Sequence, residues 1–512
     1  MHKRNALKLA AAGLITVLLG YAGWSSRFAS QAEAGAAIVQ KPGERGFSIG
    51  TLAFSPCELT QRNAATTTAA FCAPFQVPEN WDRPDGRRID LKLALIRSRA
   101  AAPELDPVVL LAGGPGQAAT QVWSHAAGSF APLLEHRHVL LLDQRGTGDS
   151  HPLYCKQSLD DDTTAADIDF DTVHARTRAC LDEVSRDADP SHYTTTVALR
   201  DLEAVRQALG APRLNLVGVS YGTRVAQQYL RRYPDSVRSV VLDSAVPNEQ
   251  VLGAEFAINL DDALKAQFAL CTQTPRCASA FGDPYASLYR LRDALAANPP
   301  TVEFRGPRDA LPRSKPLDAA TLAGVVRLFA YTADTAALLP LAIERGLQHD
   351  YAPLLGQADL LTDDLAELSG SGMQLSVICT EDADLLVERP QDAPLLLGDL
   401  SKIWRAQCAI WPRGNRPADF HTPIESDKPV LILGGEFDPV TPPRYAQAIA
   451  KGLPNSRVLI ARGQGHHVMG SGCLPRLVGR FVANLDARHL DAGCIADFAP
   501  TPAFTTFNGA AP

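Results

Sequence analysis

The sequence has 512 residues, of which 46% are hydrophobic and 21% are charged, and its net charge is −7. This composition is typical of a globular protein with one large domain and an insertion, or with two domains. The mild acidity, and the lack of a long run of Lys and Arg, give no support for nucleic-acid binding.

The N-terminus has the pattern of an export signal. A basic start, MHKR, precedes the apolar stretch ALKLAAAGLITVLLGYAGW, and the small residues of AEA at 32–34 permit cleavage after Ala34. We therefore expect residues 1–34 to be a signal peptide and the mature protein to be periplasmic or secreted, without stable membrane association. An uncleaved membrane anchor is the alternative, since the apolar stretch is near the lower length limit for a span.

The cysteines fit an oxidising compartment. There are ten, an even number, and no C-x-x-C pair suggests a zinc or redox site. Buried free thiols are the alternative for several of them. The simplest connectivity joins near neighbours in the sequence: Cys57 with Cys72, Cys155 with Cys180, Cys271 with Cys277, Cys379 with Cys408, and Cys473 with Cys494.

After a small, polar, glycine-containing tether at 35–50, the first folded segment has a β pattern. A Pro-Asp-Gly turn at 84–86 precedes Leu91, Leu93 and Leu95, which alternate with more polar positions. This alternation predicts the antiparallel edge of a sheet.

Apolar runs and amphipathic helices then alternate along the chain. PVVLLAGGPG at 107–116 and HRHVLLLDQRGTGDS at 136–150 are apolar runs that end in loops, and RSVVLDSAVP at 238–247 is a further one. LRDLEAVRQALG at 199–210 predicts a helix that ends at Gly210. The alternation predicts an α/β fold: a mostly parallel sheet with helices on both faces and with its functional loops at the carboxyl ends of the strands.

The stretch NLVGVSYGTRVAQQYL at 215–230 contains a G-x-S-x-G motif. It predicts a buried strand from Asn215 to Val219 and a helix from Gly222 onward. Ser220 would then lie on the sharp turn between them, which is the geometry of a nucleophile elbow. In a chain of this length the motif arises by chance with a probability of about 0.15, so other motifs must support it.

Between about Asn248 and Lys428 the alternation of strands and helices fades. This region is rich in Ala and Leu, is mostly helical in pattern and carries four of the cysteines. The sheet pattern resumes with KPVLILGGEFDPVTPP and SRVLIARGQGHHVMG and ends with a helix at about 474–488. We therefore expect a core at 35–247, a helical cap insertion at 248–427, and the rest of the core at 428–512.

A serine nucleophile needs an adjacent base, and the base needs an orienting carboxylate. Asp438 and His466 each follow one of the last two predicted strands. Their order after Ser220 is that of the α/β-hydrolase fold. Glu436 is the alternative acid and His467 the alternative base. Adjacent histidines in an extended loop point apart, so we expect no metal site.

Such an enzyme also needs donors for the oxyanion of the tetrahedral intermediate. The backbone N–H of Tyr221 is the first candidate. The glycine-rich loop AGGPGQ at 112–117 offers the second, with Gly114 preferred over Gly113. A plain turn is the alternative for this loop.

Several motifs, in this order, resemble the proline iminopeptidase and tripeptidyl aminopeptidase group of α/β-hydrolases. They are LLAGGPGQ, LLLDQRGTGDS, LVGVSYGTRVAQQYL, GGEFDPVTPP and GQGHHV, and SVICTEDAD with CAIWP resembles the C-terminal part of tripeptidyl aminopeptidases. The resemblance runs from about Pro74 to Cys494. It implies a serine exopeptidase that cleaves short peptides near their N-terminus without a metal or organic cofactor. Ala112 departs from the pattern of this group, in which the oxyanion loop usually begins with His.

Four charged residues remain to be assigned. We expect Asp143 and Arg145 to form a salt-bridged turn rather than to act in catalysis. Glu381 and Asp382 are candidates for binding the free α-ammonium of a peptide, with a solvated pair at a helix start as the alternative. An esterase or amidase for small acyl compounds is the second functional hypothesis, and a non-catalytic binding protein the third. A wide, acidic pocket would favour the peptidase, and a closed, apolar one the esterase.

Overall fold

The computed structural model describes residues 38–39, 46–60, 67–155, 170–359, 371–506 and 508. The predicted signal peptide, residues 1–34, lies outside the described residues. In the part of the chain that is described, no helix is both long enough and apolar enough to cross a membrane.

The core is a sheet that has 11 strands among the described residues, in the order β1-β2-β3-β4-β5-β7-β6-β8-β9-β12-β13. From β7 to β13 every neighbouring pair is parallel. These parallel strands are formed by the apolar runs that were predicted from the sequence. The strands are β1 (Ile38–Val39), β2 (Phe47–Ile49), β3 (Leu52–Thr60), β4 (Thr67–Pro78), β5 (Arg88–Ile96), β6 (Val108–Leu111), β7 (Val139–Leu142), β8 (Leu214–Val219), β9 (Val237–Asp243), β12 (Val430–Gly435) and β13 (Ser456–Ala461).

The antiparallel part is larger than the sequence predicted. β5 was expected at an edge, but it pairs with β4 on one side and with β7 on the other. Strands β1 to β4 continue the sheet beyond it. The expected edge position of β5 is therefore wrong, although its antiparallel pairing is confirmed.

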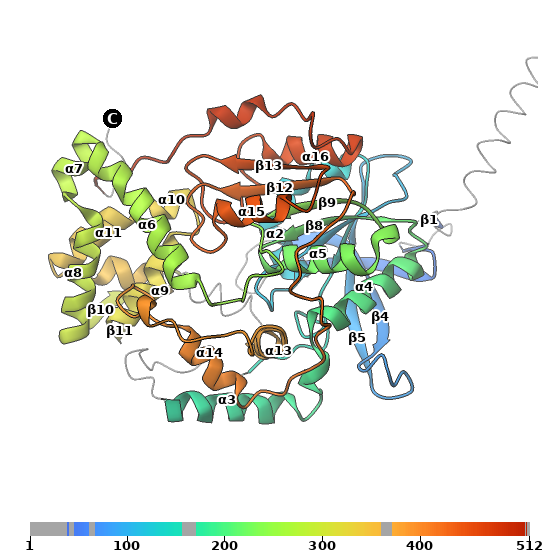
Figure 1. Ribbon diagram of the computed structural model, residues 1–512, viewed down its shortest axis with the longest axis horizontal. Helices are drawn as coiled ribbons and strands as arrows, with labels where there is room; N and C mark the ends of the chain where they lie inside the picture. The colour runs from blue at the N-terminus through green and yellow to red at the C-terminus, as the bar shows by residue number, and fades with distance from the viewer. Residues whose placement is uncertain are drawn as a thin grey trace, which may run out of the picture.

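Helices cover both faces of the sheet, as predicted (Figure 1). Successive residues of each parallel strand point to opposite faces, so Leu216 packs in one hydrophobic cluster and Val217 in the other. One face is covered by α2 (Ala119–Phe130) and α16 (Leu474–Asn484), and the other by α4 (Thr195–Leu209), α5 (Tyr221–Arg232) and α15 (Pro443–Ala450).

Residues 248–427, which we call the insert, separate β9 from β12 and have two parts (Figure 1). Helices α6, α8, α9 and α11 share a hydrophobic cluster of their own. Helix α13 instead packs into the main core, near α3 (Phe170–Val184). The elements of the insert are α6 (Phe256–Gln273), α7 (Pro275–Phe281), α8 (Pro284–Ala297), β10 (Thr301–Arg305), β11 (Pro312–Pro316), α9 (Ala319–Phe329), α10 (Ala333–Ala336), α11 (Leu339–Leu347), α13 (Ser371–Glu381) and α14 (Ser401–Cys408).

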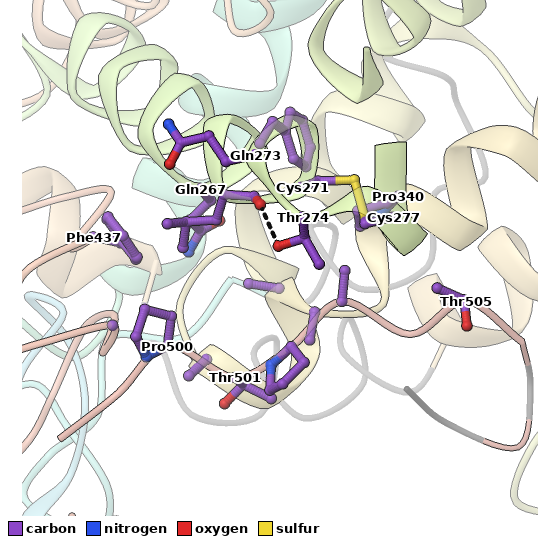
Figure 2. A pocket seen from close by; sticks show the side chains of 18 of the residues that line it. Gln267, Cys271, Gln273, Thr274, Cys277, Pro340, Phe437, Pro500, Thr501 and Thr505 are labelled. Atoms are coloured by element: carbon purple, nitrogen blue, oxygen red, sulfur yellow. Dashed lines mark hydrogen bonds between the residues drawn. A yellow bond between two sulfur atoms is a disulfide. The ribbon is translucent and has the colours of Figure 1, made fainter. Parts of the chain in front are cut away.

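The C-terminal segment crosses from the core to the insert. A cavity of about 510 Å³ lies between this segment, the end of α6 and α10, with Phe437 of the core at its wall (Figure 2). At the wall of this cavity, Phe504 N donates a hydrogen bond to Ala337 O at 2.9 Å. The segment therefore ties the two parts of the molecule together at this side.

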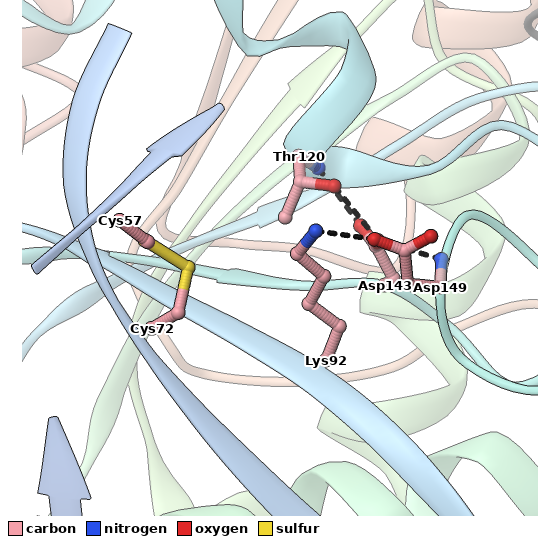
Figure 3. Close-up of a disulfide and its surroundings, with 6 residues drawn as sticks. All are labelled: Cys57, Cys72, Lys92, Thr120, Asp143 and Asp149. Carbon is pink, nitrogen blue, oxygen red and sulfur yellow. Dashed lines mark hydrogen bonds and ion pairs between the residues drawn. A yellow bond between two sulfur atoms is a disulfide. The ribbon is translucent and has the colours of Figure 1, made fainter. Parts of the chain in front are cut away.

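Disulfides join all five pairs of neighbouring cysteines, as predicted. Cys57–Cys72 links β3 to β4 across the antiparallel part of the sheet (Figure 3). A second disulfide joins the segment after β7 with α3, a third joins α6 with α7, and a fourth joins α13 with α14. The fifth joins the residue before α16 with the segment that follows this helix.

Candidate active site

Ser220 lies on a strained turn between β8 and α5. Its φ is 53° and its ψ is −122°, a conformation that L-residues rarely adopt. Ser220 N donates to Asp243 O at 2.9 Å, and Thr223 Oγ1 donates to Ser220 O at 2.6 Å. These bonds hold the turn, so the predicted bend at Ser220 is confirmed.

The two glycines of the motif are needed for close approach of the backbone. A Cβ on Gly222 would lie 2.0 Å from Leu111 O, the end of β6. A Cβ on Gly218 would lie 2.4 Å from Gly222 O. Because backbone oxygens cannot move aside, α5 can start directly at the sheet edge only with glycine at both positions.

Asp438 and His466 lie in contact at the same sheet edge. His466 Nδ1 is 2.9 Å from each carboxylate oxygen of Asp438. Asp438 is buried and also accepts hydrogen bonds from Val440 N, Thr441 N and Thr441 Oγ1, at 2.9, 2.8 and 2.7 Å. Burial alone raises the pKa of Asp438, but the charge and hydrogen bond of His466 and the bonds from Thr441 outweigh it. The pKa therefore lies below its usual value, and Asp438 stays ionised.

His466 is held from the insert as well as from the core. Its backbone N donates to Tyr331 O at 2.7 Å, and the two rings meet edge to face at 5.1 Å. Since Nδ1 faces Asp438, Nε2 is the nitrogen available to a reacting group. Within the described residues no hydrogen bond joins Ser220 Oγ to His466, and such bonds often tighten only when substrate is present.

The residues chosen as oxyanion donors lie beside Ser220. Gly114, Ser220 and Tyr221 line one small pocket of about 20 Å³. A Cβ on Gly113 would come within 3.3 Å of Ser220 Cβ, so the glycine-rich loop packs directly on the turn. The remaining residues around the pocket are Val246, Gln250, Leu252, Phe256, Asn259, Val440, Thr441 and Tyr445.

Glu381 and Asp382 do not line this pocket. Glu381 lies behind the turn, where Thr195 N and Thr195 Oγ1 donate to its carboxylate at 2.7 and 3.0 Å. Thr195 Oγ1 in turn lies 2.6 Å from the Tyr221 hydroxyl. Asp382 pairs with Arg224 at 2.9 Å, and neither side chain is exposed. Both carboxylates are thus engaged inside the protein.

The alternative of a pair at a helix start is wrong, because Glu381 is the last residue of α13. Nor is the pair solvated, since both residues are buried. Burial raises the pKa of Glu381 to about 7. The burial of these two residues could not be predicted, because it depends on how α13 packs against the core.

Asp143 and Arg145 have structural partners, but not each other. Thr120 N and Oγ1 donate to Asp143 at 2.8 and 2.7 Å (Figure 3). Arg145 binds both oxygens of Asp201, at 2.6 and 2.7 Å. The expected ion pair between Asp143 and Arg145 is therefore wrong, while a structural use of both residues agrees with these contacts.

Two contacts of the site were missed from the sequence. Thr441 follows Asp438 by three residues, and the Asp-x-x-Thr spacing is a signal for a turn in which the carboxylate accepts local hydrogen bonds. Tyr331 gave no signal, because its contact with His466 joins segments far apart in the chain. Within the described residues, no three His, Cys, Asp or Glu side chains group as metal ligands.

Comparison with known proteins places the chain in a family. The sequence profile of the α/β hydrolase fold matches residues 106–472. The chain belongs to the α/β-hydrolase fold family. The predicted fold class is thereby confirmed.

Relatives of this α/β-hydrolase agree with the resemblance seen in its motifs. It is 26% identical over 471 residues to the serine protease Hip1 of Mycobacterium tuberculosis, covering 84% of this chain and 88% of that protein. It is 27% identical over 481 residues to the tripeptidyl aminopeptidase of Streptomyces lividans, covering 84% of each. A proline iminopeptidase of Aeromonas sobria is 31% identical over 180 residues, covering 34% of this chain and 37% of that protein.

Proposed function

We propose that the protein is an exported serine exopeptidase that hydrolyses peptide bonds near the N-terminus of short peptides. The observation that carries the proposal is the Asp438–His466 pair, which lies at the sheet edge where Ser220 occupies a strained turn. Relatives named as a serine protease and a tripeptidyl aminopeptidase, each aligned over 84% of this chain, support the peptidase class.

The mechanism follows from the roles that these groups can take. Ser220 Oγ attacks the peptide carbonyl, and His466 Nε2 takes the proton from Ser220 and then gives it to the leaving amine. Asp438 holds His466 Nδ1–H and stabilises the imidazolium. The N–H groups of Tyr221 and Gly114 would bind the oxyanion. Water, activated by His466, then releases the acyl group from Ser220.

Export is part of the proposal. Disulfides form stably in the periplasm or outside the cell and are rare in the cytosol. All of the cysteines lie within disulfides, which fits the export pattern of the N-terminal sequence.

An esterase or amidase for small acyl compounds is the second candidate. One observation favours it: the pocket beside Ser220 holds only about 20 Å³, has no charged residue among the described residues that line it, and includes the apolar side chains of Val246, Leu252 and Phe256. A closed, apolar pocket suits a small acyl group better than three amino-acid residues.

Paired chromogenic substrates would separate the two candidates. Each pair consists of the free and the N-blocked form of one peptide amide, and a simple acyl ester is assayed beside them. We expect cleavage of free-amine amides only, and its loss in Ser220→Ala. Ester cleavage without amide cleavage would assign the esterase, and amide cleavage that survives in Ser220→Ala would exclude the mechanism. Circular dichroism of the variant controls for its fold.

A further inference from the structure

A second Asp–His pair lies directly beside the first. His467 Nδ1 is 2.5 Å from Asp243 Oδ2, and Asp243 is the last residue of β9. This strand neighbours β8, with Val219 in register with Asp243. The second pair therefore joins the loop of the proposed base to the strand beside the proposed nucleophile.

Asp243 connects to both sides of the site through its other atoms. Its backbone carbonyl accepts the N–H of Ser220 at 2.9 Å. Its carboxylate accepts the N–H groups of Val468 and Met469, each at 3.0 Å. One residue thus holds both the turn of Ser220 and the loop that carries His466.

The backbone is strained on both sides of this contact. His467 has a φ of 65° and Ser244 a φ of 56°, both in the left-handed region. His467 N donates to Ser244 Oγ at 2.7 Å. Strain of this kind persists where the surrounding bonds enforce it, and it clusters at functional sites.

The pair also balances a buried charge. The side chain of Asp243 has no exposed surface, whereas that of His467 is 38% exposed. Desolvation lowers the pKa of His467, but the charge and hydrogen bond of Asp243 outweigh it and raise the pKa. Asp243 is the charged group that contacts His467, and the preceding residue in the chain, His466, contacts Asp438.

We propose that Asp243 and His467 form a positioning pair that fixes His466 relative to Ser220 and compensates the buried Asp243 charge beside it. The proposal rests on the proposed function, because it takes His466 as the base. Without the charge of His467, the buried Asp243 carboxylate would lack its counter-charge, and an uncompensated carboxylate favours the charged form of a nearby base. The enzyme would then need a higher pH to present a neutral base.

The variant His467→Asn removes both the charge of the imidazole and its ion-paired contact with Asp243. Asn tolerates a left-handed backbone, so the turn itself can persist. The readout is the rate at which a small alkyl fluorophosphonate labels Ser220, measured by mass spectrometry across pH. We expect labelling to slow about tenfold to a hundredfold, and the acid limb of the pH–rate profile to move to higher pH.

Two further variants complete the test. His489→Asn is the matched control, since His489 pairs with Asp486 on the surface, where its side chain is 82% exposed; it should leave the profile unchanged. The double variant Asp243→Asn/His467→Asn removes both charges, so its acid limb should return toward that of the wild type while labelling stays slow.

The outcomes are separable. If His467→Asn labels at the wild-type rate, the positioning pair is refuted. Slow labelling with an unmoved acid limb also refutes it, because that result is what a merely structural role of His467 predicts. If the wild-type protein is not labelled at Ser220 at all, the proposed function itself fails.

Discussion

Thr441 shows how much the proposed acid depends on one hydroxyl. Its Oγ1 donates to Asp438 Oδ2 at 2.7 Å and lies 3.3 Å from His466 Nδ1. Thr441→Val keeps the branched shape but removes one of the two donors to Asp438 Oδ2, which leaves His466 Nδ1 as the remaining one, at 2.9 Å. We expect kcat to fall about tenfold, since such a loss costs about 1–3 kcal/mol, with little change in KM. Steady-state kinetics on the amide substrates measure both.

Thr441→Ser is the control for that experiment, because it keeps the hydroxyl. It should retain most of the activity that Thr441→Val loses. Wild-type kcat in Thr441→Val would show that the bonds from Val440 N and Thr441 N suffice to hold Asp438.

The raised pKa of Glu381 predicts that the stability of the protein depends on pH. Its pKa of about 7 in the folded protein lies above the usual value of 4.5, because the carboxyl is buried. As pH rises between these values, the unfolded chain ionises while the folded one keeps its proton, so stability falls. The loss amounts to about 3 kcal/mol at full effect. Glu381→Gln should remove it, as urea denaturation at pH 5 and pH 8 would show.

The exposed Glu303→Gln on β10 is the matched control and should keep the wild-type difference between the two pH values. An unchanged difference in Glu381→Gln would contradict the assignment to Glu381. The same variant tests Glu381 as the ammonium anchor, because an unaltered preference for free over blocked N-termini would exclude that role.

At the residue scale, the sequence predicted the positions that local pattern determines. Ser220, Asp438 and His466 each follow an apolar run, so their approach at one sheet edge could be inferred from chain order alone. The partners of Glu381 and Asp382 could not be inferred, because Thr195 and Arg224 are distant in sequence and meet them only through tertiary packing.

At the scale of elements, the contact between α5 and the sheet depends on glycine. Gly222→Ala would place a Cβ 2.0 Å from Leu111 O, and neither backbone can yield without separating α5 from β6. We expect a loss of more than about 3 kcal/mol in the free energy of unfolding, or insoluble protein. Urea denaturation followed by circular dichroism measures it.

Gly128→Ala on α2 is the matched control. A Cβ there would meet nothing within 4 Å. Since alanine favours a helix over glycine, this change should stabilise the protein by about 0.5–1 kcal/mol. Equal effects of the two substitutions would show that the close approach of α5 to the sheet is not what requires glycine.

The parallel strands and their helices were predictable from the sequence. A buried parallel strand is apolar on both faces, whereas a covering helix is apolar on one face. Gly210, for example, ends α4 in a left-handed conformation, as its position after the amphipathic pattern predicted. The pairing of β5 was not predictable, because alternation in one strand does not reveal what lies on its two sides.

For the whole molecule, the sequence predicted the insertion but not its division. That prediction rests on the fading of the strand pattern after β9. The insert divides into a helical part with its own core and a part joined to the main core. This division depends on α13, whose apolar residues could pack in either of these two cores. Whether the insert acts as a cap over Ser220 stays a proposal.

The C-terminal segment gives a test of how the insert is held. A Cβ on Gly463 would lie 2.3 Å from Pro500 Cα, so the segment packs tightly on the core there. Further on, Ala503 and Phe504 pack against Cys271, Cys277, Phe281 and Leu341 of the insert. Ending the chain after Phe498 removes these contacts while keeping the Cys473–Cys494 disulfide.

We expect this truncation to leave the sheet intact and to loosen α7 and α11. The lost apolar contacts of Phe504 are worth at most about 3 kcal/mol. Even half of that corresponds to about tenfold faster amide hydrogen exchange if exchange there occurs by local opening. Exchange followed by mass spectrometry would measure it, with β8 and β9 as internal references that should not change. A chain that lacks only residues 509–512 keeps Phe504 and serves as the control. Unchanged exchange in α7 and α11 after the longer truncation would show that the insert holds its position through its own helices, without the C-terminal segment.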